Sequence, residues 1–284
     1  MKINLIKNYN NIPSFKSNDI PPKQVSFQNA NVQNLSPREK LNSIISPQKL
    51  NMVYKEICDF LKLDFKPELK LLDTYKDNRG GGYNFKRHEV SLLIEDLTCS
   101  DYKIIGSKNG KKTVLEFGTL PLFATAELAK EFIQRANSNR NFGYDSIEVV
   151  PTTQEDKTRL ILQKLYHELI HAQQHQIMRQ TEGIGEKEIL KAWTHIKPND
   201  TKNYPNIKQI TEQDFRNSFW ADKKPTKSMI GKNTPLGNLA YTWLENIRNY
   251  PPIDSPQYNR IALEVDAYKR SAQYVYSIFG PLKA

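Results

Sequence analysis

The stretch Tyr166-His167-Glu168-Leu169-Ile170-His171-Ala172 decides how the rest of the chain is interpreted. It contains His-Glu-x-x-His, and the residues from Glu155 to Gln180 around it include neither proline nor glycine. Two threonines that can cap the start, and Gly183 just beyond the end, are typical of the limits of a helix. We therefore expect one long helix in which His167 and His171, four residues apart, project from the same face. An apolar stripe on another side is expected to face the core: Leu162, Leu165, Leu169 and Ala172.

The two histidines and the glutamate between them have the residue types and spacing of a zinc site. One turn of helix separates the imidazoles of His167 and His171, so both can reach a single ion at about 2.0–2.1 Å. Glu168 lies beside that ion and can take a proton from water bound to it. Two ligands and a base at this spacing are the minimal parts of a zinc hydrolase, and a chance match on an ordinary helix is the alternative.

A catalytic zinc site usually has three protein ligands and leaves one position for water, so a third ligand is expected. His175 continues the four-residue series, but it lies about 12 Å from His167 and is interpreted as a surface residue. Glu264, on the last predicted helix, would approach from a neighbouring element. The small residues Ala267 and Ser271 would let the two helices pack closely. Four other acidic residues compete with Glu264: Glu182, Glu186, Glu188 and Glu245.

The combined motifs resemble the gluzincin branch of the zincin metallopeptidases. The resemblance rests on His-Glu-x-x-His followed by Glu264-x-Asp266-Ala267, with Tyr258 six residues before the glutamate, and is closest to small, poorly characterised members. It implies three zinc ligands: His167, His171 and Glu264. It also implies that Glu168 is the general base and that Tyr258 or Tyr268 stabilises the oxyanion.

The same resemblance predicts where a substrate would lie. The family places an upstream strand along the cleft, and the residues from Gly82-Tyr83-Asn84 to Val90-Ser91-Leu92 resemble that strand. The chain departs from the family pattern in two places. Ala262 stands where a proline is often found, and 92 residues (172–263) separate the second histidine from Glu264. The long separation implies an insertion that folds away from the site.

The remaining patterns predict an α+β protein. Further helices are expected over four stretches with apolar residues at helical spacing: Pro47–Lys62, Thr125–Ala136, Leu239–Arg248 and Asn259–Phe279. Short strands are expected at Leu69–Tyr75, Tyr83–Phe85, Val90–Ile94, Tyr102–Ile105, Thr113–Phe117 and Ile147–Val150. We expect a zincin-like arrangement, in which a small mixed or antiparallel sheet packs on the active-site helix. A C-terminal helix would supply the third ligand.

The chain is expected to have one folded domain and a flexible leader. Residues 1 to 48 are rich in Asn, Ser, Pro, Gln and Lys and show no sustained period, which is typical of a leader or linker. Residues 49 to 284 are expected to form the zincin-like metallopeptidase domain. Prolines punctuate residues 183 to 237, so this part is expected to be the insertion, with short helical pieces such as Glu212–Trp220.

The charge and hydropathy of the chain limit its partners. The net charge is +10, but the lysines are spread along the chain, so we expect a lysine-rich solvated surface and no nucleic-acid partner. No apolar stretch approaches 18 residues and the N-terminus has no apolar core of a signal peptide, so no membrane span is expected. The default location is cytoplasmic, with export by a route that leaves no N-terminal signature as the alternative.

These patterns together predict a zinc-dependent metallopeptidase with Zn²⁺ as cofactor and a peptide or protein as substrate. The alternative is a catalytically inactive zincin-fold binding or effector module, which the long insertion and the basic charge would suit. A closed site with four protein ligands would support the alternative, whereas an open position would count against it.

Overall fold

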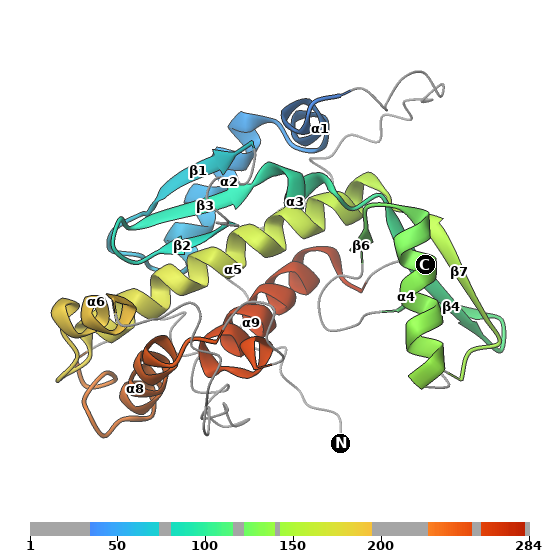
Figure 1. Cartoon of the computed structure of the whole chain (residues 1–284). Helices are drawn as coiled ribbons and strands as arrows, with labels where there is room; N and C mark the ends of the chain where they lie inside the picture. The colour runs from blue at the N-terminus through green and yellow to red at the C-terminus, as the bar shows by residue number, and fades with distance from the viewer. Residues whose placement is uncertain are drawn as a thin grey trace.

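A computed structural model describes residues 35–73, 81–115, 122–139, 143–194, 227–251 and 257–281. These residues form an α+β protein with two small sheets rather than the single sheet that the sequence predicted. The long helix α5 (Gln154–Gln180) runs through the middle (Figure 1). One sheet lies on one side of α5, the helices near the C-terminus lie on the other, and the second sheet lies beyond its N-terminal end (Figure 1).

Helix α5 begins and ends close to where the sequence predicted. Thr153 caps it in a capping box, in which the Thr153 side chain accepts from the backbone N–H of Asp156 and the Asp156 side chain accepts from the backbone N–H of Thr153. The predicted apolar stripe is buried, but burial is not confined to one side. Every residue from Leu165 to Met178 except Glu168 is buried. Because neighbouring elements cover α5 on several sides, its polar residues are held in the interior.

The first sheet is mixed and contains β1 (Glu68–Leu72), β2 (Gly82–Asn84) and β3 (Glu89–Leu93). Strands β2 and β3, both expected from the sequence, pair as an antiparallel hairpin, and His88 in its turn has φ of 52°. Strand β1 pairs with β3 in parallel, so β3 lies in the middle of the sheet. The chain then continues directly into α3 (Ile94–Thr98), which packs against α5.

The second sheet is antiparallel around β4 (Tyr102–Lys108). Along one edge of β4 lie two strands, β5 (Lys111–Val114) and β6 (Leu122–Phe123), and along the other edge lies β7 (Ser146–Pro151). Helix α4 (Ala126–Asn139) packs on this sheet around a small core of its own: Ile104, Leu115 and Ala129. A buried ion pair of 2.9 Å between Lys103 and Asp156 fastens the sheet to the start of α5.

In the part of the chain described from residue 35 on, two helices precede the first sheet, α1 (Pro37–Ile44) and α2 (Pro47–Phe60). The second was predicted, but α1 falls within residues 1 to 48, which were assigned to the flexible leader. Helix α1 has a capping box of Ser36 and Glu39, and its Leu41 is buried in the main core. The folded part therefore begins before residue 49. Residues 1 to 34 lie outside the described residues.

Among the described residues, the C-terminal part contains three α-helices: α6 (Glu186–Thr194), α8 (Pro235–Arg248) and α9 (Ala262–Phe279). Helix α9 starts three residues later than predicted, because a short 3-10 helix occupies residues 258–260. Helix α6 falls within the predicted insertion and packs on α8 and α5. The predicted helical piece Glu212–Trp220 lies outside the described residues.

Contacts between α5 and α9 bring together parts of the chain that are far apart in sequence. The rings of Tyr166 and Tyr274 stack with centroids 4.1 Å apart and planes 12° apart. Arg159 of α5 is 2% exposed and donates to the carbonyls at the end of α9, at 2.7 Å for Phe279 and 2.9 Å for Gly280. The small residues Ala267 and Ser271 of α9 are completely buried. These contacts fix the register of the two helices.

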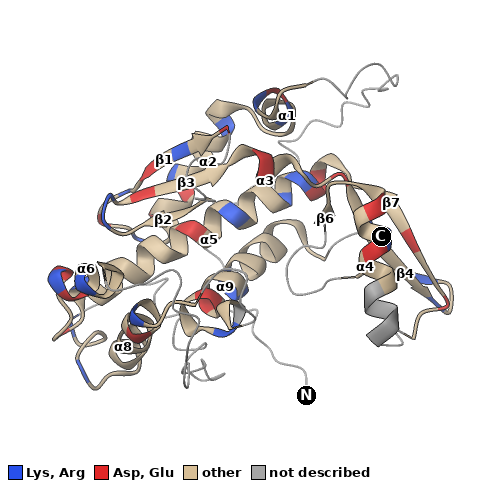
Figure 2. Ribbon diagram, viewed as in Figure 1, with Lys and Arg blue, Asp and Glu red and all other residues tan. Residues whose placement is uncertain are grey.

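Charged side chains are interspersed over the described elements, and acidic and basic residues follow one another along β1, α5 and α6 (Figure 2). Within the part of the chain that the structure describes, none of the helices has the length and apolar character needed to cross a membrane.

Candidate metal centre

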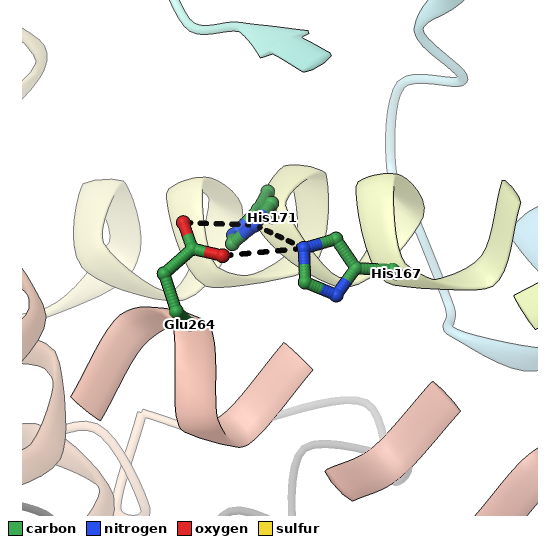
Figure 3. A group of neighbouring side chains, drawn as sticks. All are labelled: His167, His171 and Glu264. Carbon is green, nitrogen blue, oxygen red and sulfur yellow. Dashed lines mark hydrogen bonds and ion pairs between the residues drawn. The ribbon is translucent and has the colours of Figure 1, made fainter. Parts of the chain in front are cut away.

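Three side chains with metal-binding atoms meet between α5 and α9. Nε2 of His167 and Nε2 of His171 lie 3.1 Å apart. The carboxylate of Glu264 reaches across from the first turn of α9, with Oε2 3.3 Å from Nε2 of His167 and Oε1 3.5 Å from Nε2 of His171 (Figure 3). All three residues are buried, and Glu264 is completely buried. The three side chains that the third-ligand argument selected are therefore brought together, and their binding of zinc stays a prediction.

The geometry of this cluster fits a tetrahedral ion. An ion with bonds of about 2.0–2.2 Å holds its ligand atoms roughly 3.3–3.6 Å apart. The distances of 3.1, 3.3 and 3.5 Å between the three pairs of ligand atoms agree with that spacing. Two imidazole nitrogens and one carboxylate are donors that zinc prefers. Buried Oε2 of Glu264 has no hydrogen-bond partner among the described residues, as expected for an atom whose lone pair faces an ion.

A hydrogen bond fixes which nitrogen of His171 faces the cluster. Nδ1 of His171 donates to Oε1 of Gln174 at 2.8 Å, which leaves Nε2 as the nitrogen that faces Glu264. Gln174 is held in turn, because its Nε2 donates to the Leu263 carbonyl at 3.0 Å and to Asp266 at 2.8 Å. The orientation of this ligand is therefore set by contacts to α9.

From its place two residues after Glu264 in the motif, Asp266 could be either a surface acid or a residue that supports a ligand. It is completely buried and contacts Gln174 and Arg270, the latter at 3.5 Å. Arg270 also donates to Oε1 of Gln173 at 2.6 Å, and Gln173 donates to the carbonyl of Leu61. The surface interpretation is wrong, since Asp266 belongs to a buried polar network that joins α5, α9 and the end of α2.

No pattern in the sequence indicated the hydrogen-bond partner of Glu264. The hydroxyl of Tyr250, two residues after α8, donates to Oε1 of Glu264. Burial raises the pKa of Tyr250 well above its ordinary value, and the Glu264 charge raises it further, so this hydroxyl keeps its proton. A donor on Oε1 leaves Oε2 as the oxygen free to face an ion.

The charges of the cluster stabilise one another in the metal-free protein. Burial would lower the pKa of His171, but the Glu264 carboxylate outweighs burial and raises that pKa to about 9. Burial would raise the pKa of Glu264, but attraction to His171 and the close contacts with both histidines hold it well below its ordinary value. A site that holds an ionised carboxylate in the interior is suited to a cation.

Glu168, the predicted base, lies on α5 directly after the first ligand and is half-buried. Its charge raises the pKa of His171 and of Tyr258 and Tyr268, although in each case it acts after burial and Glu264. The carboxylate therefore lies close enough to the cluster to act on groups bound there.

Both tyrosines that the family resemblance named lie beside the cluster. The ring of Tyr268 packs against His167 with centroids 4.4 Å apart, and burial raises its pKa to about 12. The hydroxyl of Tyr258 lies 3.3 Å from that of Tyr250, and burial followed by the Glu264 charge raises the pKa of Tyr258. Both hydroxyls are thus protonated at neutral pH and able to donate.

The other residues considered as the third metal ligand have different contacts. His175 is buried, not on the surface as predicted, and its Nε2 lies 3.3 Å from Glu186. Glu188 and Glu245 both pair with Arg248. The side chain of Glu182 is exposed. Of the described residues, only His167, His171 and Glu264 form a group of three potential ligands.

The residues expected to pair with a substrate form two strands of the first sheet. The resemblance assigned that role to residues 82–92, but β3 pairs with β1 on one edge and with β2 on the other. A strand with both edges paired cannot add a further strand. Of these two strands only β2 has an outer edge, so pairing with a substrate stays a prediction for β2 alone.

Comparison with known proteins gives no relative: no family model, no curated protein and no solved structure matches the chain. The family resemblance therefore stays an expectation, and the site is interpreted from its own geometry.

Proposed function

We propose that this chain is a zinc-dependent metallopeptidase of the zincin type, which hydrolyses peptide bonds in a peptide or protein. The observation that carries the proposal is the group of His167, His171 and Glu264, with ligand atoms 3.1–3.5 Å apart. Three such donors in the described residues, rather than four, are the usual number in a catalytic zinc site. That number favours an enzyme over the alternative of an inactive binding module.

Zinc held by these residues would lower the pKa of a water molecule and polarise a carbonyl group. Glu168 takes the proton of the attacking water as the new C–O bond forms at the scissile carbonyl. It then gives this proton to the amine nitrogen as the C–N bond breaks. The half-buried position of Glu168 beside the cluster suits both steps, because the carboxylate can contact water as well as the ligands.

Tyr268 is the better candidate for stabilising the negative oxygen that develops on the substrate. Its ring already packs on His167, and it keeps its proton at neutral pH. The hydroxyl of Tyr258 lies against Tyr250, which itself donates to Glu264. Tyr258 would have to leave that contact before it could donate to a substrate.

The test is Glu168→Gln, which keeps the size of the side chain and removes the base. Bound zinc should stay at the wild-type level, because Glu168 is not among the ligands. Turnover should fall by roughly 10²–10⁴-fold, the usual contribution of a general base. Cleavage is measured by mass spectrometry on a peptide library, together with the zinc content of both proteins.

Glu182→Gln is the matched control, since it makes the same chemical change at an exposed acid just after α5. It should leave both zinc and cleavage unchanged. Wild-type cleavage rates in Glu168→Gln would contradict the proposed mechanism. Zinc-loaded wild type that cleaves no peptide of the library would favour the binding module.

A further inference from the structure

The helix that carries both histidines of the centre has a narrow exposed side. Between Arg159 and Met178, three residues of α5 are half-buried and all the others are buried. The half-buried residues follow one another at intervals of four: Leu160, Lys164 and Glu168. Residues at this spacing lie on one face of a helix, one turn apart. They therefore form a single stripe along α5, which we call the open stripe.

The open stripe lies on the face of α5 that carries the metal ligands. Lys164 stands seven residues, or close to two turns, before His171, so the two side chains leave the helix in nearly the same direction. Beyond His171 this face is closed, because His175, one turn further on, is buried. The exposed part of the face therefore runs from the centre toward the N-terminus of α5, past Glu168 and then Lys164.

Lys164 is the cation of the open stripe, and its charge is incompletely compensated. Its Nζ donates to the carbonyl of Asp96 in α3 at 2.8 Å, which uses one of the three ammonium hydrogens. Within the described ranges of the chain, Lys164 forms no ion pair. Burial lowers the pKa of this ammonium, and the charges of Asp96, Cys99 and Glu168 raise it only in part. A further carboxylate beside Lys164 would therefore be stabilising.

We propose that Lys164 binds a carboxylate of the substrate and makes the enzyme prefer acidic peptides, an inference that rests on the proposed metallopeptidase function. The helical rise places Lys164 about 6 Å along α5 from Glu168. An extended peptide advances about 3.3 Å per residue. When the scissile carbonyl lies beside Glu168, a carboxylate one or two residues away can therefore reach Lys164. Either an acidic side chain or the C-terminal carboxylate of a short peptide supplies this group.

Two features of the chain favour a carboxylate over a neutral group at this position. Lys164 is half-buried, so its bond to a charged acceptor is screened less by water than a bond at the open surface. The net charge of +10 also favours the approach of acidic peptides. A lysine that only supported the Asp96 carbonyl of α3 would not distinguish an acid from the amide of the same shape, and the test uses this difference.

The test compares peptide libraries that differ in a single carboxylate. One pair has Glu or Gln at a fixed position, which is moved along the peptide in successive libraries, and a second pair has a free or an amidated C-terminus. Wild type should cleave the acidic member of one pair with a kcat/KM about 10–100-fold higher, as expected for a hydrogen bond between charged groups. A preference in the first pair identifies an acidic side chain, and one in the second pair identifies the C-terminal carboxylate.

Three variants assign the preference to Lys164. Lys164→Met keeps an unbranched side chain without the charge and should cleave both members of the pair alike, whereas Lys164→Arg should keep the preference. Lys157→Met is the matched control, because Lys157 is a half-buried lysine of the same helix that pairs with Asp101, and it should also keep the preference. A general loss of stability lowers both rates and leaves their ratio unchanged. All three variants should bind as much zinc as wild type, since neither lysine is a ligand.

Equal cleavage of the acidic and amide members by wild type would overturn the inference, and so would a preference that survives in Lys164→Met. If zinc-loaded wild type cleaves no peptide, the proposed function fails, and binding of the same libraries, labelled with a fluorophore, is measured by anisotropy. Tighter binding of the acidic member that is lost in Lys164→Met would then support the carboxylate site without the peptidase. Equal binding of both members would overturn the carboxylate site as well.

Discussion

The proton of His171 makes the stability of the metal-free protein depend on pH. Its pKa in the folded protein is about 9, above the value of about 6.5 expected in the unfolded chain. A group whose pKa is raised by folding stabilises the protein fully below the unfolded pKa, and this stabilisation is lost as pH rises through the folded pKa. The contribution is at most about 3 kcal/mol, since one pKa unit is about 1.36 kcal/mol.

We therefore expect the melting temperature of the metal-free protein to fall between about pH 6.5 and pH 9, measured by calorimetry in the presence of a chelator. Glu264→Gln is the control, because the Glu264 charge is what outweighs burial and raises the pKa of His171. In this variant the melting temperature should change much less with pH between about pH 6.5 and pH 9. If the melting temperatures of the two proteins changed with pH in the same way, the assigned role of Glu264 would be contradicted.

Some residues of the centre could be predicted from the sequence and others could not. His167 and His171 follow from spacing on one helix, and Gln174, three residues after His171, could have been found as its neighbour on the same face. Tyr250 had no such signal. Its contact with Glu264 depends on how the end of α8 meets α9, which no local pattern records.

Arg159 links the two helices that form the centre. It donates to the last carbonyls of α9 and also pairs with Glu155 at 2.9 Å. Lysine has the charge but not the planar group that bonds several oxygens at once. We expect Arg159→Lys to lower the free energy of unfolding by about 1–3 kcal/mol, measured by urea denaturation.

Arg248→Lys is the comparison for this prediction. Arg248 is 42% exposed and pairs with Glu188 and Glu245 at the surface. Its replacement should change stability by less than about 0.5 kcal/mol. Equal losses in the two variants would mean that Arg159 does not hold the end of α9.

Elements were predictable where local signals agreed with one another. Helix α5 has a capping box and no breakers, and the hairpins have short turns such as Asn109-Gly110, where both φ angles are positive. Helix α1 was missed although Ser36, Pro37 and Glu39 form a readable start signal, because a polar composition suggested a leader. The parallel pairing of β1 with β3 depends on tertiary contacts and had no signal.

On the scale of the whole molecule, α5 is the helix against which many of the other described elements pack. It carries both histidines of the centre, and it contacts the first sheet, α6, α8 and α9. A ligand from α9 reaches α5 only when segments more than ninety residues apart have packed together. Metal binding at the centre is therefore expected to be coupled to the folding of this interface.

The most direct test of zinc binding at this centre is an anomalous-scattering map of zinc-loaded crystals of the whole chain. We expect a strong zinc peak between His167, His171 and Glu264, about 2.0–2.2 Å from each ligand atom, with one coordination position left to water. The absence of a zinc peak at these three side chains would contradict the central claim. A peak closed by a fourth protein ligand would contradict the catalytic role and favour a structural metal.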